Sequence, residues 1–92
     1  MAGRDWQELW LRQARADYEW LAAHRPALAE RVDALIEDIQ RRPFAGLGRP
    51  EPLRGNLAGW WSRRIDREHR LVYLVSGANP RSLDIAQCRY HY

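Results

Sequence analysis

The sequence predicts an α+β domain in which two helices cover one face of an antiparallel sheet. Its 92 residues suit one domain, because single domains commonly reach about 100 residues or more. One-faced helical periodicity is confined to the first half, and the second half carries runs rich in β-branched and aromatic residues. Because helices precede strands without βαβ alternation, we expect them to pack on one sheet face and leave the other face to solvent or a ligand.

The composition indicates a folded protein with a basic second half. Hydrophobic residues make up 46% and charged residues 29%, as in globular chains. All fifteen basic residues are Arg, whose guanidinium matches phosphate and stacks on rings. Residues 1–46 carry seven Arg and eight acidic residues (net −1), whereas residues 47–92 carry eight Arg and four acidic residues (net +4). With a pI near 9.6, this asymmetry favours a polyanionic partner, either nucleic acid or an acidic protein.

Cysteine usage and hydropathy predict a cytoplasmic protein. Cys88 is the only cysteine, so the chain forms neither an internal disulfide nor a thiolate zinc site. The first residues reach charged side chains without the apolar run of a signal peptide, and no stretch is apolar enough to span a membrane. His24, His69 and His91 are too scattered to suggest a metal site. We therefore expect a membrane-independent domain that uses no metal or other cofactor.

The chain begins with a segment of undecided type, followed by a short helix. Residues 6–11 fit either a short strand or an extension of that helix, because periodicity does not separate the two. Ala14, Asp17 or Tyr18, and Leu21 then share one helical face.

A second, more regular helix is expected over residues 26–41. Its apolar side chains recur at i, i+4, i+7, i+8 and i+11, namely Leu28, Val32, Leu35, Ile36 and Ile39. Pro26 suits the first turn, the Arg41–Arg42 pair suits the negative C-terminal end, and Pro43 ends the helix.

The middle of the chain, residues 43–59, is expected to be a long loop. It holds three of the five prolines and four of the six glycines. Irregular connections of this length inside a small domain are commonly functional. Leu47, Leu53 and Leu57 are spaced through it, which indicates that the loop is pinned to the domain.

The remainder is expected to form an antiparallel meander of three strands, over residues 60–65, 70–75 and 83–92. By alternation, Gln87, Arg89 and His91 share one face of the last strand, and Arg70 opens the middle strand. Arginine and histidine side chains are therefore predicted on strands rather than in loops.

One set of side chains is suited to phosphodiester chemistry. Glu51 lies between two prolines, which hold its backbone and carboxylate in place at low entropic cost. The other members are Arg63, Arg64, Arg70, Arg89, Tyr90, His91 and Tyr92. Metal-free RNA cleavage needs a base for the 2′-hydroxyl, a cation for the phosphorane and an acid for the 5′-oxygen, and carboxylate, guanidinium and imidazole fill those roles. Taken singly, Glu51 and His91 also fit an ordinary loop carboxylate and an exposed terminal histidine.

Three sequence runs resemble a known toxin family. They are RPFAGLGRPEPLRGNL at residues 42–57, GWWSRRIDREHRLVY at residues 59–73 and CRYHY at residues 88–92. These runs are similar to those of the YoeB/Txe toxins of bacterial toxin–antitoxin modules, within the RelE-like ribonuclease superfamily. The resemblance begins at about Trp10 and implies one RelE-like toxin domain over residues 1–92. The implied fold is that of the RelE-like microbial ribonucleases, with two helices on a mainly antiparallel sheet of four to five strands and residues 7–11 as the first strand.

The resemblance also implies an activity. Toxins of this family are ribosome-dependent endonucleases that cut messenger RNA in the A site without a metal, through attack by the 2′-hydroxyl, and leave a 2′,3′-cyclic phosphate. It assigns four residues catalytic roles: Glu51 as general base, Arg70 as phosphate stabiliser, His91 as general acid and Tyr92 packing at the scissile nucleotide. The RNA-binding and phosphate-binding residues are then expected to be Arg54, Arg63, Arg64, Arg89, Tyr90, Trp60 and Trp61.

The tryptophans have alternative roles. Trp60 and Trp61 could form two stacking platforms for bases, but one core ring and one rim ring is the favoured interpretation. Trp6, Trp10 and Trp20 are expected in the core.

The resemblance implies three kinds of partner: a YefM/Axe-like antitoxin with an acidic C-terminal segment, the 70S ribosome with its message, and a second copy in a homodimer. Rival functions on the same fold are a ParE-like toxin that binds DNA gyrase, a plain RNA-binding module, and a catalytically inactive relative kept for regulation. None of these needs Glu51, Arg70 and His91 at once, so the intact set favours the nuclease.

Overall fold

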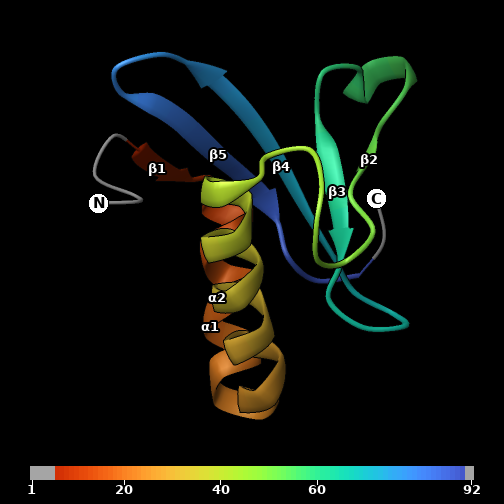
Figure 1. The fold of residues 1–92 in the computed structure, drawn as a ribbon. Coiled ribbons are helices and arrows are strands. Elements are labelled where there is room, and N and C mark those ends of the chain that lie inside the picture. Colours follow the sequence, from red (N-terminus) through yellow and green to blue (C-terminus); the bar gives the residue numbers. More distant parts are fainter. Residues whose placement is uncertain (1–5, 91–92) are drawn as a thin grey trace.

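Five strands form one mixed sheet, and two helices lie side by side against it (Figure 1). This computed structural model describes residues 6–90. In sheet order the strands are β1 (Trp6–Trp10), β5 (Arg81–Gln87), β4 (Arg70–Gly77), β3 (Trp61–Arg64) and β2 (Glu51–Pro52). β1 runs parallel to β5, and the other neighbouring pairs are antiparallel. The predicted α+β class with a mainly antiparallel sheet of four to five strands is confirmed, and the single parallel pair makes the sheet mixed.

The helices follow the periodicity of the sequence. α1 spans Arg12–His24, and α2 spans Pro26–Arg41, the bounds predicted for it. On α2, Val32, Leu35 and Ile39 are fully buried. Burial of each such side chain stabilises the fold by about 1.5–3 kcal/mol, so the apolar face of α2 holds the helix against α1 and the shared core. Neither α1 nor α2 has the length and apolar character needed to cross a membrane.

The core lies between the helices and the two central strands. Strands β4 and β5 supply its buried sheet side chains, which are Leu71, Tyr73, Leu83 and Ile85. Trp6, Trp10 and Trp20, expected in the core, are only partly buried and pack at its margin. These indole rings therefore cover the core edge without filling its centre.

The undecided N-terminal segment is a strand. β1 pairs with β5 in parallel register, with Trp6 opposite Arg81 and Trp10 opposite Ile85. The Arg81 guanidinium also lies 4.9 Å from the centre of the Trp6 ring. These contacts join residues about 75 positions apart, so local periodicity could not reveal them.

The last strand is shorter than predicted. β5 ends at Gln87, and the chain then turns away from the sheet because Cys88 donates its N–H to Asp17 Oδ2 of α1 at 3.1 Å. The Arg89 guanidinium lies 3.5 Å from the Trp20 ring on α1. The expectation that Arg89 extends the strand on the face of Gln87 is therefore wrong. Residues 91–92, also assigned to that strand, lie outside the described residues.

The loop over residues 43–59 is pinned to the domain, as expected. It contains the two residues of β2 and a short 3₁₀ helix, Gly55–Leu57. Leu53 is buried, and the Gly48 carbonyl accepts a 2.6 Å hydrogen bond from the backbone N–H of Arg64. Leu47 is held through its backbone, because its side chain is exposed while its N–H donates to Asp38.

Candidate functional site

Glu51 and Arg70 meet across strand β3. Arg70 Nη1 lies 3.2 Å from Glu51 Oε1 and 3.4 Å from Ser62 Oγ on the strand between them. The register explains this contact, because Glu51 is opposite Ser62 and Arg70 is opposite Arg64. By alternation with the core residue Leu71, Arg70 points to the sheet face opposite the helices.

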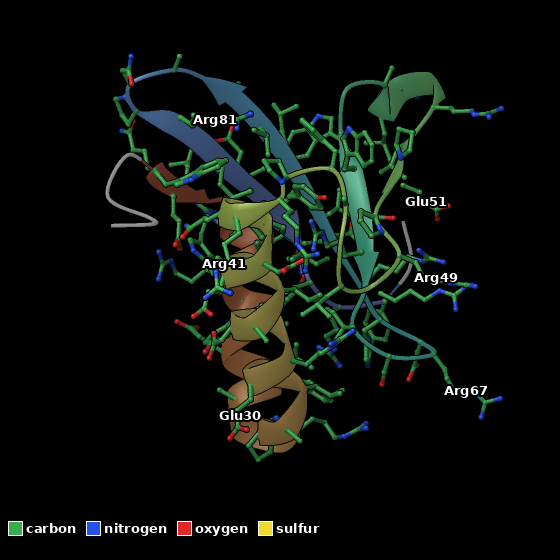
Figure 2. All side chains as sticks on the ribbon, in the orientation of Figure 1. Glu30, Arg41, Arg49, Glu51, Arg67 and Arg81 are labelled. Carbon is green, nitrogen blue, oxygen red and sulfur yellow. The ribbon has the colours of Figure 1, made fainter. Side chains whose placement is uncertain are left out.

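The two side chains differ in exposure. The Glu51 side chain is 52% exposed, whereas that of Arg70 is 16% exposed. A partly desolvated guanidinium is a stronger electrostatic partner for an anion than one in bulk water. The carboxylate in turn remains open to a proton donor from outside the protein. Figure 2 shows Glu51 and Arg49 on the side of the molecule that carries β2 and β3, away from the helices.

The C-terminal segment is anchored beside Arg70. The Arg70 backbone N–H donates to the Tyr90 carbonyl at 3.1 Å, and the Tyr90 N–H donates to His69 Nδ1 at 2.8 Å. Residue 90 therefore lies at the start of β4, next to the Glu51–Arg70 pair. His91 and Tyr92 lie outside the described residues, so their assigned roles stay predictions.

Asp66 shapes the turn that leads into Arg70. Its Oδ1 accepts the backbone N–H groups of Glu68 and His69 at 2.9 and 2.8 Å. Burial alone would raise the pKa of Asp66, but these two hydrogen bonds outweigh it and hold that pKa below its usual range. The ionised carboxylate therefore organises the turn that sets the start of β4.

Arg63 is not presented to RNA, which corrects the expectation for this residue. Its side chain is fully buried, and all of its nitrogens donate inside the protein. The acceptors are Asp38 Oδ2, the Tyr73 hydroxyl and the carbonyls of Arg42, Ala45 and Leu47. A guanidinium with every donor satisfied in the interior has none left for phosphate.

Asp38 is the counter-charge of Arg63. Burial would raise the pKa of this carboxyl, but hydrogen bonds from Arg42, the Leu47 N–H and Arg63 outweigh burial and hold the pKa well below its usual range. Asp38 therefore stays ionised, and the Arg63–Asp38 ion pair fixes the loop that leads to Glu51. The sequence pattern gave no sign of this ion pair, since Asp38 looks like one more polar residue on the outer face of a helix.

The other predicted RNA-binding residues divide by exposure. Arg54, Arg64 and Tyr90 are exposed, whereas Arg89 is partly buried against Trp20. Both Trp60 and Trp61 are partly buried. Trp61 packs against the core and lies 4.8 Å from the Phe44 ring, so it serves the fold on at least one side.

Sequence reasoning missed two polar residues beside the candidate site, Ser62 and His69. Ser62 is fully buried, and its hydroxyl accepts from Arg70. His69 is 3% exposed and holds Tyr90. The only sequence signal was their position next to Arg63 and Arg70. Over residues 6–90, no group of three or more His, Cys, Asp or Glu side chains is arranged to hold a metal ion.

Comparison with known proteins places the chain in a family. The profile described as YoeB-like toxin of bacterial type II toxin-antitoxin system matches residues 10–92. A Toxin YoeB of Synechocystis is 50% identical over 76 residues, which cover 83% of this chain and 85% of that protein. The solved structure titled YoeB/ParE toxin from Agrobacterium tumefaciens has a TM-score of 0.90 at 46% identity, over 94% of this chain and 99% of that one.

Two structures from Staphylococcus aureus are similar as well. The YoeB dimer has a TM-score of 0.86 at 36% identity, covering 96% of this chain and 99% of that one. The heterotetrameric YoeB-YefM toxin-antitoxin complex has a TM-score of 0.84 at 38% identity, covering 94% of this chain and 97% of that one. The chain described here therefore belongs to the YoeB-like toxins of bacterial type II toxin–antitoxin systems.

Proposed function

We propose that this toxin is a ribosome-dependent messenger RNA endoribonuclease that cleaves by metal-independent acid–base catalysis. The observation that carries the proposal is the 3.2 Å contact between Arg70 and Glu51 on the open sheet face. This contact brings a carboxylate and a guanidinium within the span of one phosphodiester, which supports their proposed roles as base and phosphate-binding cation. The exposed arginines Arg54 and Arg64 supply further positive charge for the nucleic-acid backbone.

Glu51 takes the proton of the 2′-hydroxyl, and the resulting oxygen attacks the adjacent phosphorus. Arg70 neutralises the charge that grows on the phosphorane oxygens. The bond to the 5′-oxygen then breaks, and His91 gives that oxygen its proton. The products are a 2′,3′-cyclic phosphate and a free 5′-hydroxyl, and the proton gained by Glu51 balances the one lost by His91. Tyr92 packs at the scissile nucleotide in this scheme.

A ribosome requirement follows from the shape of the site. Glu51 is about half exposed, and a hollow of about 390 Å³ elsewhere in the described residues is lined by residues of β1, α1 and α2 instead. An open site of this kind cannot hold a flexible strand with its 2′-oxygen in line with the scissile bond. A message ordered in the A site supplies that geometry.

The proposed partners follow from the same relatives. By analogy with the S. aureus complex, a YefM-like antitoxin binds this toxin and covers its basic face, and by analogy with the S. aureus dimer, two copies associate. The 70S ribosome and its message complete the set, so the proposed place of action is the cytoplasm.

The test is cleavage of a defined message on programmed 70S ribosomes, compared with the same message alone. Glu51→Gln and His91→Ala should each lower the cleavage rate by about 100-fold or more, since each proton-transfer role is worth roughly 10²- to 10⁴-fold. Glu37→Gln, an exposed carboxylate on α2, is the matched control and should cut normally. The products should carry no free 3′-hydroxyl.

Equal cutting of naked message would overturn the ribosome requirement. Undiminished cutting by Glu51→Gln would overturn the base assignment. Growth arrest by Glu51→Gln without any RNA cleavage would favour the gyrase-binding alternative.

A further inference from the structure

We infer that His69 is a positioning residue for the proposed reaction, on which this inference rests. Its imidazole fixes the backbone of Tyr90 and so sets the point from which the last two residues, including the proposed acid His91, extend. Among the described residues, no hydrogen bond or ion pair joins the His69 imidazole to Glu51 or to the Arg70 guanidinium. Its effect therefore passes through Tyr90, whose N–H it accepts and whose ring lies 5.5 Å from the imidazole.

Tyr90 is held from two sides by adjacent residues of β4 and its turn. Its N–H donates to His69 Nδ1 at 2.8 Å, and its carbonyl accepts the Arg70 N–H at 3.1 Å. Tyr90 also has a φ of 64°, a left-handed conformation that is uncommon for a residue other than glycine. A backbone in this conformation needs such partners, because it is strained for a residue that carries a side chain. The hydrogen bond to His69 therefore helps to set the direction of the chain at residue 90.

His69 is itself held firmly. It is 3% exposed, its N–H donates to Asp66 Oδ1 at 2.8 Å, and its carbonyl accepts from Ile65 at 2.9 Å. Because Nδ1 accepts the Tyr90 N–H, that nitrogen carries no proton, and the ring proton sits on Nε2. Nε2 faces the Glu68 carboxylate at 3.6 Å, which favours this tautomer.

The rest of the C-terminal segment does not depend on His69. Cys88 is bound to Asp17, and Arg89 packs on Trp20, so α1 holds the chain as far as residue 89. Loss of the His69 contact should therefore release only the backbone of Tyr90 and leave the fold in place. The position of Tyr90 matters for the proposed acid His91, which follows it in the chain, because a displacement of a catalytic group by about 1 Å can lower the rate by about 10²-fold.

Two substitutions separate the hydrogen bond that His69 makes to Tyr90 from the space that its side chain fills. His69→Leu keeps an apolar side chain of similar size but removes the acceptor for the Tyr90 N–H. His69→Asn places an amide oxygen near the position of Nδ1 and keeps the acceptor. On programmed ribosomes under single-turnover conditions, we expect His69→Leu to slow cleavage by about 10- to 100-fold with ribosome affinity little changed. His69→Asn should recover the rate to within a few-fold of the unmodified toxin.

The His91→Ala background tests whether His69 acts through the tail. There, adding His69→Leu should cause no further loss, because the group that it positions is gone. An equal loss in both backgrounds would overturn the inference. So would full activity of His69→Leu, or equal damage from His69→Leu and His69→Asn. Failure of the unmodified toxin to cut at all would instead overturn the proposed nuclease function.

A measurement on the unmodified toxin keeps the contact testable if His69→Leu does not fold or the nuclease proposal fails. Nitrogen-15 NMR should report an unprotonated Nδ1 on His69, and hydrogen exchange should show a protected Tyr90 amide. Rapid exchange of that amide, or a proton on Nδ1 at neutral pH, would show that the hydrogen bond from the Tyr90 N–H to His69 is absent.

Discussion

Arg63 Nη1 lies 2.7 Å from Asp38 Oδ2, in the interior between β3 and α2. The same guanidinium binds the carbonyls of Arg42, Ala45 and Leu47, so one side chain ties the start of the central loop to helix and sheet. The next residue, Arg64, is exposed. Of these two adjacent arginines, Arg63 therefore stabilises the interior, and Arg64 lies at the surface.

Arg63→Met should lower the free energy of unfolding by about 3–5 kcal/mol, because it leaves Asp38 buried without this partner. Arg64→Met should change it by no more than about 0.5 kcal/mol, as is usual for exposed sites. Urea unfolding of the two variants measures the difference. Equal effects would contradict the burial of Arg63.

Asp38 should make stability depend on acid. Its folded-state pKa lies below the unfolded value of ~3.9, so its contribution is complete above that value and is lost as the pH falls toward the folded-state pKa. The unmodified toxin should therefore lose stability below about pH 4 more steeply than Asp38→Asn. Urea unfolding across pH 2.5–7 tests this. Glu37→Gln, next to Asp38 but exposed, should still show the steep loss of stability below about pH 4.

Gly48 should resist substitution because the chain is crowded there. Its φ is +78°, and a Cβ would lie 2.9 Å from the Arg64 carbonyl oxygen and 2.9 Å from Leu35 Cδ2. Gly48→Ala should cost about 2–3 kcal/mol, the sum of backbone strain and a clash with main chain. Gly55→Ala is the control, since φ is +63° but nothing lies within 4 Å of its Cβ. Thermal unfolding should show a clearly larger loss for Gly48→Ala, and equal losses would refute the clash.

Arg70→Lys should separate charge from geometry at the candidate site. Arg70 Nη1 alone contacts both Glu51 and Ser62. Lysine keeps the positive charge but loses the planar fork of five N–H donors, so one ammonium nitrogen would have to serve Glu51, Ser62 and the phosphate together. We expect cleavage on programmed ribosomes to fall by about 10²- to 10³-fold, in the range for loss of one transition-state donor. Arg67→Lys, in the neighbouring turn and exposed, should cut normally. A fully active Arg70→Lys would show that charge alone suffices.

The sequence by itself determined the two helices, strands β3 and β4, and the packing of helices on one face of a sheet. The 26–41 helix was predictable because its stripe of apolar residues is a local signal that one buried face imposes. Strands β3 and β4 were predictable to within a few residues for the same reason. Glu51 could be singled out because its flanking prolines restrict the backbone locally.

Only the tertiary structure decided which polar side chains are interior. Arg63 and Arg64 are chemically identical and adjacent, and alternation says only that they point to opposite faces. Which face is buried depends on the loop and on α2, which lie up to 25 positions away in the chain. Partners distant in sequence also decide three other features. They make residues 6–10 a strand, end β5 at Gln87, and bind the Tyr90 N–H to His69. Burial and hydrogen-bond partners are properties of the packed chain, so they cannot be predicted from local propensity.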